Sequence, residues 1–327
     1  MPDSLNIWCN YPLPEASAAR LRAAAAHHRL TIHVRDASLP PERDAPAPVP
    51  PGTEVIFGQP DVDAVLSLET LQWVHLSSAG YTHYDRDDVR AALRGRGAVL
   101  TNSSQVFAGP CAQHVAAMML AVAHQLPGSL DNQRSARAWF QHDAKARQGR
   151  FLGAGDTVFI YGYGAIARCL VDILRPLGMR CVGVRRTVRG DEGVPMLTEA
   201  EADARLGEAG HVVNILPAND ATRGFFGAAR FTRFQPGARF YNIGRGVTVD
   251  QEALVDALRA GRPGVAYLDV TTPEPLPPEH PLWTTPNCYV TPHIAGAHAG
   301  EDGRLVTHFL DNLARYEADE ALADRVF

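Results

Sequence analysis

Residues 158–174 read VFIYGYGAIARCLVDIL: an apolar run, then Gly162-x-Gly164-x-x-Ala167, then a stretch with an apolar stripe at helical spacing. This order predicts a strand, a tight turn and a helix, in which the first glycine allows the turn and the second lets a pyrophosphate approach the backbone. The N-terminus of the helix supplies free N–H groups and a positive dipole to phosphate. The stretch therefore predicts a dinucleotide-binding turn, and the alternative is a close-packed turn without a ligand. The predicted cofactor contacts are Gly162, Gly164, Ala165 and Ile166.

Two arginines, Arg185 and Arg186, end the next predicted strand. In NAD-binding turns of this kind, an Asp or Glu about 20 residues further on binds the ribose 2′-hydroxyl. Guanidinium groups instead make charge-assisted, often bidentate, hydrogen bonds to a 2′-phosphate. The pair predicts NADP(H) as the preferred cofactor and NAD(H) as the second choice. The alternative is a solvated arginine pair without a cofactor role.

Short apolar runs alternate with helical or loop stretches on both sides of this turn. The runs are residues 5–11, 30–34, 54–58, 73–77 and 98–102, and then 157–161, 180–184, 211–216, 238–243, 264–270 and 288–290. Strands separated by helical crossovers predict parallel sheets. We therefore expect an α/β protein made of two Rossmann/flavodoxin-like parallel-sheet domains with a cleft between them. From Pro110 to about Leu126, a mostly apolar stretch predicts a buried helix that connects the domains and is a candidate dimer contact.

Composition excludes several classes of function. The 327 residues carry a net charge of −5, so there is no basic footprint for nucleic acid. No run approaches the roughly 20 apolar residues of a membrane helix, and no secretory signal is recognisable. The five cysteines are scattered, which suits a reducing compartment and offers no pair of zinc ligands, so we predict a cytoplasmic protein without a metal site. Lys145 is the only lysine and lies in a polar stretch, which argues against Schiff-base chemistry.

Three functional groups follow the last three predicted strands: Arg245 between two glycines, Glu274 in a proline-rich loop, and His293 in TPHIAG. Ligands of open α/β sheets bind outside the carboxyl ends of the strands, so these groups are expected to meet at one edge. Arginine can hold a carboxylate and a carbonyl, and histidine can give and take a proton near neutral pH. A neighbouring Glu274 would orient the imidazole and stabilise its protonated form. The pattern predicts hydride transfer between a nicotinamide and a small 2-oxo or 2-hydroxy acid. Taken singly, each of these three residues could instead have a purely structural role.

The stretches 162–167, 215–224, 241–258, 267–283 and 291–296 together resemble the D-isomer-specific 2-hydroxyacid dehydrogenase family. The resemblance implies that Arg245, Glu274 and His293 are catalytic. It implies a substrate-binding domain of residues 1–103 with 297–327, a dinucleotide-binding domain of 104–296, closure of the cleft between them, and a homodimer. The implied substrate-binding residues are Ser78, Ala79, Gly80 and Arg245. The remaining cofactor-binding residues are expected to be Leu216, Pro217, Thr222, Ile243, Gly244 and Asp269.

The chain also departs from the family. Gln113 stands where members usually have an acidic residue, and Arg185 with Arg186 replaces the acid of NAD-using members. Glu274 argues against formate oxidation, and Ala79 argues against phosphite oxidation. The leading reading is a D-specific reductase of a small 2-oxo acid such as glyoxylate or hydroxypyruvate. Two alternatives remain: a dinucleotide-sensing corepressor or scaffold without significant turnover, and an enzyme for a bulkier sugar acid, whose pocket Tyr81, His83, Trp139 and Trp283 would shape.

Overall fold

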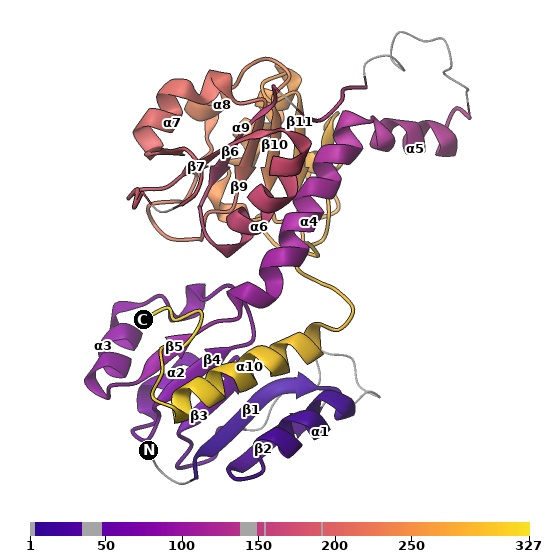
Figure 1. Cartoon of the computed structure of the whole chain (residues 1–327). Coiled ribbons are helices and arrows are strands. Elements are labelled where there is room, and N and C mark those ends of the chain that lie inside the picture. The colour runs from indigo at the N-terminus through magenta and orange to yellow at the C-terminus, as the bar shows by residue number, and fades with distance from the viewer. Residues whose placement is uncertain (1–3, 35–47, 138–148, 154, 191) are drawn as a thin grey trace. The chain divides into compact units, whose positions relative to one another are not determined.

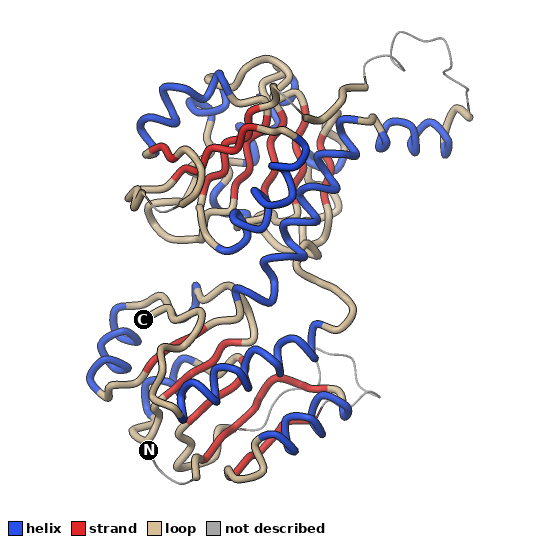
Figure 2. Tube along the Cα trace, in the orientation of Figure 1, coloured by secondary structure: helices blue, strands red, loops and turns tan. Residues whose placement is uncertain are grey.

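The computed structural model describes residues 4–34, 48–137, 149–153, 155–190 and 192–327. The chain forms two compact units, one of Met1–Phe107 with Ala297–Phe327 and the other of Ala108–Gly296. Each unit has one sheet of parallel strands with helices around it (Figures 1 and 2). The predicted α/β class with two parallel sheets is therefore confirmed. Trp139 and Lys145 lie outside the described residues.

The first unit has a five-stranded sheet in the order β2-β1-β3-β4-β5. This is the flavodoxin-like strand order, which reverses direction between β1 and β3. Its strands are β1 (Asn6–Leu13), β2 (Arg29–Val34), β3 (Val55–Gly58), β4 (Trp73–Leu76) and β5 (Val99–Thr101). Its helices are α1 (Glu15–Ala24), α2 (Val62–Ser67), α3 (Asp87–Gly95) and α10 (Glu301–Glu317).

Helix α10 packs on this sheet although it follows the second unit in sequence. The ring of Phe309 stacks on Phe57 at 4.6 Å and on Trp73 at 5.2 Å between centroids. All three side chains are fully buried. Burying an aromatic side chain of this size contributes about 1.5–3 kcal/mol, so α10 is part of the core of the first unit.

The second unit has a seven-stranded sheet in the order β12-β11-β10-β9-β6-β7-β8. The order reverses between β6 and β9, so the carboxyl ends of these two strands flank the expected ligand crevice. The strands are β6 (Thr157–Tyr161), β7 (Arg180–Val184), β8 (Met196–Leu197), β9 (His211–Asn214), β10 (Arg239–Asn242), β11 (Val265–Leu268) and β12 (Cys288–Val290). The helices are α5 (Leu126–Arg134), α6 (Ala165–Leu174), α7 (Glu199–Arg205), α8 (Ala228–Phe231) and α9 (Gln251–Arg259).

Helix α4 (Ser104–Ala123) differs from the predicted helix at both ends. It begins six residues before Pro110, so the prediction that this proline opens the helix is wrong. The first turn is stabilised from outside, because Asn102 accepts the N–H of Ser104 and Asp324 accepts that of Gln105. Such caps satisfy amides that have no partner within the helix.

By length and composition α4 could cross a membrane, with a mean hydropathy of 1.5, which corrects the expectation that no stretch is long and apolar enough. Its side chains Ala112, Val115 and Met119 lie in the core of the second unit. The dimer contact expected on this helix stays a prediction.

Candidate functional site

The turn after β6 has the backbone expected of a pyrophosphate cradle. Gly162 has φ of +90°, and a Cβ there would lie 2.8 Å from the carbonyl oxygen of Ile215. A Cβ at Gly164 would meet nothing within 4 Å, so the space beside it is open. Ala167 is fully buried where α6 packs against the sheet. The residues present therefore fit a dinucleotide.

Helix α6 begins at this turn, with Gly164 at its N-cap and no side chain bonded to the cap. The first N–H groups of a helix have no partner within it, and the helix is long enough to carry a dipole. Ala165 and Ile166 are half-buried in the first turn. Amides at this point of a helix can bind phosphate oxygens, and the binding of a cofactor by Ala165 and Ile166 stays a prediction.

The two arginines after β7 have different surroundings. Arg186 is exposed, whereas Arg185 Nη1 lies 3.3 Å from Glu192 Oε1, a carboxylate whose side chain is fully buried. Glu192 also accepts the backbone N–H groups of Arg189 and Gly190, both at 2.8 Å, and these bonds lower the pKa of its carboxyl. The sequence prediction found no carboxylate at this strand end. Glu192 lies seven residues after Arg185 in the sequence, and the loop between them folds back and brings its carboxylate to Arg185.

The turns after β9 and β10 are joined by a network of buried amides that the sequence analysis missed. Asn214 Nδ2 donates to Asn242 Oδ1 at 3.0 Å and to Thr248 Oγ1 at 2.7 Å, and all three side chains are fully buried. Thr248 Oγ1 in turn donates to the carbonyl of Arg245 at 2.6 Å. Leaving one of these groups unpaired would cost about 1–3 kcal/mol, so the network fixes the backbone that carries Arg245.

The other predicted cofactor residues lie on the same turns. Asn214 Oδ1 accepts the N–H of Leu216, and Asn242 Oδ1 accepts the N–H of Gly244. Thr222 is buried and donates its hydroxyl to the carbonyl of Pro217 at 2.6 Å. Ile243 is half-buried, and its N–H donates to the backbone carbonyl of Asn214. Their binding of a cofactor stays a prediction.

Gly246 is required by a close approach of two backbone segments. A Cβ on Gly246 would lie 1.8 Å from the carbonyl oxygen of Thr271, and one on Gly244 would lie 2.6 Å from that of Leu216. These contacts show that the two glycines let neighbouring turns of the protein pack together. Thr271 donates its N–H to Glu274 Oε1 at 2.9 Å, so this approach also places Glu274.

Replacing Gly246 by Ala should therefore damage both stability and activity. The methyl group must push Thr271 away, and overpacking of this kind costs about 1–3 kcal/mol or more. We expect a lower thermal midpoint. At temperatures where the variant is still folded, we also expect a lower turnover than that of the wild type. The matched control is Gly303→Ala in α10, where a Cβ meets nothing within 4 Å. A Gly246→Ala protein as stable and active as Gly303→Ala would contradict the argument.

His293 and Glu274 are in contact. His293 Nδ1 lies 2.9 Å from Glu274 Oε2, and both side chains are partly exposed, at 53% and 38%. His293 has φ of +53°, the left-handed region that residues other than Gly, Asn and Asp rarely adopt. Since Nδ1 faces the carboxylate, the Nε2 atom is the nitrogen left for proton transfer.

Asp269 holds the loop that carries His293. The carboxylate is 4% exposed and accepts the N–H groups of Ile294 and Ala295 and the hydroxyl of Thr291, at 2.6–2.9 Å. Its backbone carbonyl accepts the N–H of His293 at 2.8 Å. These bonds show that Asp269 supports the loop that carries His293, and its predicted binding of the cofactor stays a prediction.

Arg245 is half-buried, and its Nη1 donates to the carbonyl of Gly244 at 2.6 Å. Burial lowers the pKa of the guanidinium, and the nearby charge of Glu274 raises it. Arginine stays protonated under such opposing influences, so a fixed cation lies within electrostatic reach of the His293–Glu274 pair. This edge can bind an anion and exchange a proton in one place.

The predicted substrate loop lies in the first unit, after β4. Ser78, Ala79 and Gly80 are half-buried, and the Ser78 hydroxyl donates to the carbonyl of Gly80 at 2.7 Å. Gln113 is exposed on α4, and nothing in its surroundings explains its difference from the family pattern.

One group in the described residues has the spacing of metal ligands: His27, His28 and Glu317. The N–H of Leu5 donates to His28 Nδ1 at 3.2 Å, so the neutral ring carries its proton on Nε2, 2.7 Å from Glu317 Oε1. Burial lowers the pKa of His28, which favours this neutral form. The expectation of a protein without a metal site stays a prediction. All five cysteines are free, and the cytoplasmic location stays a prediction.

Comparison with known proteins gives a consistent result. Residues 116–295 match the family described as "D-isomer specific 2-hydroxyacid dehydrogenase, NAD binding domain". A glyoxylate reductase/hydroxypyruvate reductase of Mus musculus is 31% identical over 69% of this chain and 68% of its own length. A D-isomer specific 2-hydroxyacid dehydrogenase of Xanthobacter autotrophicus, solved with NADPH and MES, is 26% identical, covers 99% of this chain and 98% of its own, and has a TM-score of 0.81. An NADPH-dependent glyoxylate/hydroxypyruvate reductase of Sinorhizobium meliloti, solved with NADP and sulfate, is 26% identical. The match covers 99% of this chain and 98% of that one, with a TM-score of 0.75.

Proposed function

The chain belongs to the D-isomer-specific 2-hydroxyacid dehydrogenase family, and we propose that it is an NADP-dependent reductase of a small 2-oxo acid such as glyoxylate or hydroxypyruvate. The observation that carries the proposal is the contact of His293 Nδ1 with Glu274 Oε2 at 2.9 Å, beside the cation of Arg245. The two NADP(H)-bound neighbours support the choice of cofactor.

Each residue of this edge has a defined task in the proposal. A nicotinamide dinucleotide bound at the Gly162–Ile166 turn would supply the hydride. Arg245 binds the carboxylate and polarises the carbonyl of the substrate. His293 donates the proton from Nε2 to the carbonyl oxygen on reduction and takes it back on oxidation. Glu274 accepts Nδ1–H, which fixes the orientation of the ring and stabilises the imidazolium.

A panel of 2-oxo acids, each with NADPH and with NADH and followed at the nicotinamide absorbance, tests this function. We expect turnover with the small acids and faster turnover with NADPH. Tight binding of the dinucleotide without turnover of any acid would contradict the proposal and favour a sensing protein.

The cofactor preference assigns different tasks to the two arginines. Arg186 is exposed and free to bind a 2′-phosphate, whereas Arg185 is partly neutralised by Glu192. Glu192 in turn fixes the backbone of the loop that carries Arg186, through the amides of Arg189 and Gly190. Arg186 is therefore the main contact of the 2′-phosphate in this proposal, and Arg185 adds to the positive field.

Replacing Arg186 by Ala should raise the KM for NADPH about tenfold and leave the KM for NADH within about twofold. A hydrogen bond to a charged group contributes about 1.5–3 kcal/mol, and each 1.4 kcal/mol corresponds to tenfold. The matched control is Arg180→Ala, an exposed arginine at the opposite end of the same strand. If the KM for NADPH and the KM for NADH rise by the same factor in Arg186→Ala, the charge of Arg186 does not discriminate between the two cofactors.

A further inference from the structure

In the loop Ser78–Gly80 the carbonyls of Ser78 and Ala79 are held by residues that follow β5, and Gln59 Nε2 also donates to Ser78 Oγ at 3.0 Å. The N–H of Ser103 donates to the carbonyl of Ser78 at 3.0 Å, and Asn102 Nδ2 donates to the carbonyl of Ala79 at 2.7 Å. In a planar trans peptide the C=O and N–H point in opposite directions. The N–H of Ala79 therefore points away from Ser103, and the N–H of Gly80 points away from Asn102. Within the described residues no hydrogen bond uses either of them. Two successive amides without a partner can bind an anion.

Ser103 and Asn102 are themselves fixed. The Ser103 hydroxyl donates to the carbonyl of Leu76 at 2.7 Å and lies 3.3 Å from Nε2 of the fully buried His75. Both ends of the Asn102 amide are used, because Oδ1 accepts the N–H of Ser104 at 3.2 Å. The side chain of Asn102 is thus oriented before any ligand arrives.

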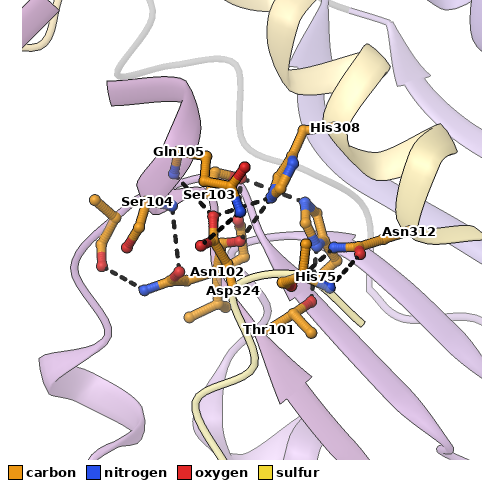
Figure 3. Close-up of polar contacts among 12 residues, drawn as sticks. His75, Thr101, Asn102, Ser103, Ser104, Gln105, His308, Asn312 and Asp324 are labelled. Carbon is orange, nitrogen blue, oxygen red and sulfur yellow. Dashed lines mark hydrogen bonds and ion pairs between the residues drawn. The ribbon is translucent and has the colours of Figure 1, made fainter. Parts of the chain in front are cut away.

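The partner that holds Asn102 is Asp324, far away in sequence (Figure 3). The N–H of Asn102 donates to the carbonyl of Asp324 at 3.0 Å. The Asp324 carboxylate accepts the N–H of Gln105 at 2.8 Å and lies 3.2 Å from Nε2 of His308, and both side chains of this pair are 11% exposed. The same His308 nitrogen lies 3.3 Å from the carbonyl of Asn102. Charge-assisted bonds in such a shielded place are stronger than exposed ones.

The segment that carries Asp324 is tied to the sheet along its length. Asn312, fully buried in α10, bonds both the N–H and the carbonyl of Ala323, at 2.8 and 3.1 Å. Leu100 of β5 exchanges backbone hydrogen bonds with Val326 and Phe327, at 2.8 and 3.0 Å. Residues 323–327 therefore extend the edge of the sheet beside β5 and place Asp324 against Asn102.

We propose that Asn102 and Asp324 are positioning residues for substrate. Asp324 fixes the backbone at Asn102, Asn102 Nδ2 turns the amide of Gly80 toward the substrate carboxylate, and the adjacent Ser103 N–H turns that of Ala79. The inference rests on the proposed function and on the predicted substrate-binding role of Ser78, Ala79 and Gly80. Neither side chain touches the substrate. Both act by keeping the two N–H groups aimed in one direction, which lowers the cost of ordering the loop when substrate binds.

The test is a set of three single variants. Asn102→Ser keeps an oxygen able to cap the helix but is too short to reach the carbonyl of Ala79. Asp324→Asn removes the charge and, like Asp, tolerates the left-handed backbone of that position, φ of +54°. The matched control is Asp319→Asn, an exposed aspartate with φ of +56° in the turn after α10.

The measured quantities are kcat, the KM for glyoxylate, the KM for NADPH and the thermal midpoint. We expect the KM for glyoxylate to rise about tenfold in Asn102→Ser and about threefold in Asp324→Asn, with kcat and the KM for NADPH within about twofold and Asp319→Asn unchanged. Hydrogen exchange of the amides of residues 102–105 should become faster in the first two variants only.

Three results would overturn the inference. Wild-type turnover with an unchanged KM for glyoxylate in both variants refutes the positioning role alone. A lower thermal midpoint together with a lower kcat and equal rises in the KM for glyoxylate and the KM for NADPH shows a merely structural role. A wild-type protein that reduces none of the 2-oxo acids refutes the proposed function, and the inference with it.

Discussion

His293→Asn should lower kcat with a 2-oxo acid by a factor of about 10² or more, the usual contribution of a general acid. Asn is the sharpest replacement because it tolerates the left-handed backbone of this position, φ of +53°, and has no group that donates a proton near neutral pH. The loss then reports the chemistry of the imidazole and not a strained backbone. Steady-state kinetics with saturating NADPH measure it.

The affinity for NADPH should be unchanged in this variant. His293 lies in the loop after β12, whereas the predicted pyrophosphate turn lies after β6. A fluorescence titration with NADPH checks this. The control is His124→Ala, an exposed histidine just after α4, which should keep full activity. Turnover of His293→Asn within about threefold of wild type would remove His293 from the mechanism.

Arg245→Ala should lower kcat/KM for the 2-oxo acid by about 10²–10³, the effect of losing one fixed electrostatic contact to the developing charge. The side chain is half-buried and anchored on the carbonyl of Gly244, so its charge is held in place before substrate binds. Arg245→Lys should recover only part of the activity, because an ammonium group cannot bind carboxylate and carbonyl in a planar fork.

Chemical rescue separates this role from a structural one. Added guanidinium ion at low millimolar concentration should restore part of the turnover of Arg245→Ala and leave His293→Asn inactive. The thermal midpoint of Arg245→Ala should stay close to that of wild type. An Arg245→Ala enzyme with nearly normal kcat/KM, or one that guanidinium leaves unchanged while its midpoint falls, would contradict the assignment.

Local patterns in the sequence were enough for the fold class and for the position of the predicted pyrophosphate turn. The apolar runs predicted strands because a buried parallel strand must be apolar on both faces. The glycine spacing at Gly162 and Gly164 predicted the turn because it reflects backbone freedom within a few residues. The same reasoning placed Arg245, Glu274 and His293 at one sheet edge, since parallel strands end together; their catalytic roles stay predictions.

The tertiary structure decided what no local pattern can express. Only folding brings Thr271 against Gly246, buried Glu192 under Arg185, and Asp324 onto the first turn of α4 ahead of Pro110. The network of Asn214, Asn242 and Thr248 likewise joins separate turns. The physical reason is that helix and strand periodicity depends on neighbours along the chain, whereas close approach and the pairing of buried polar groups depend on which distant segments the topology brings together.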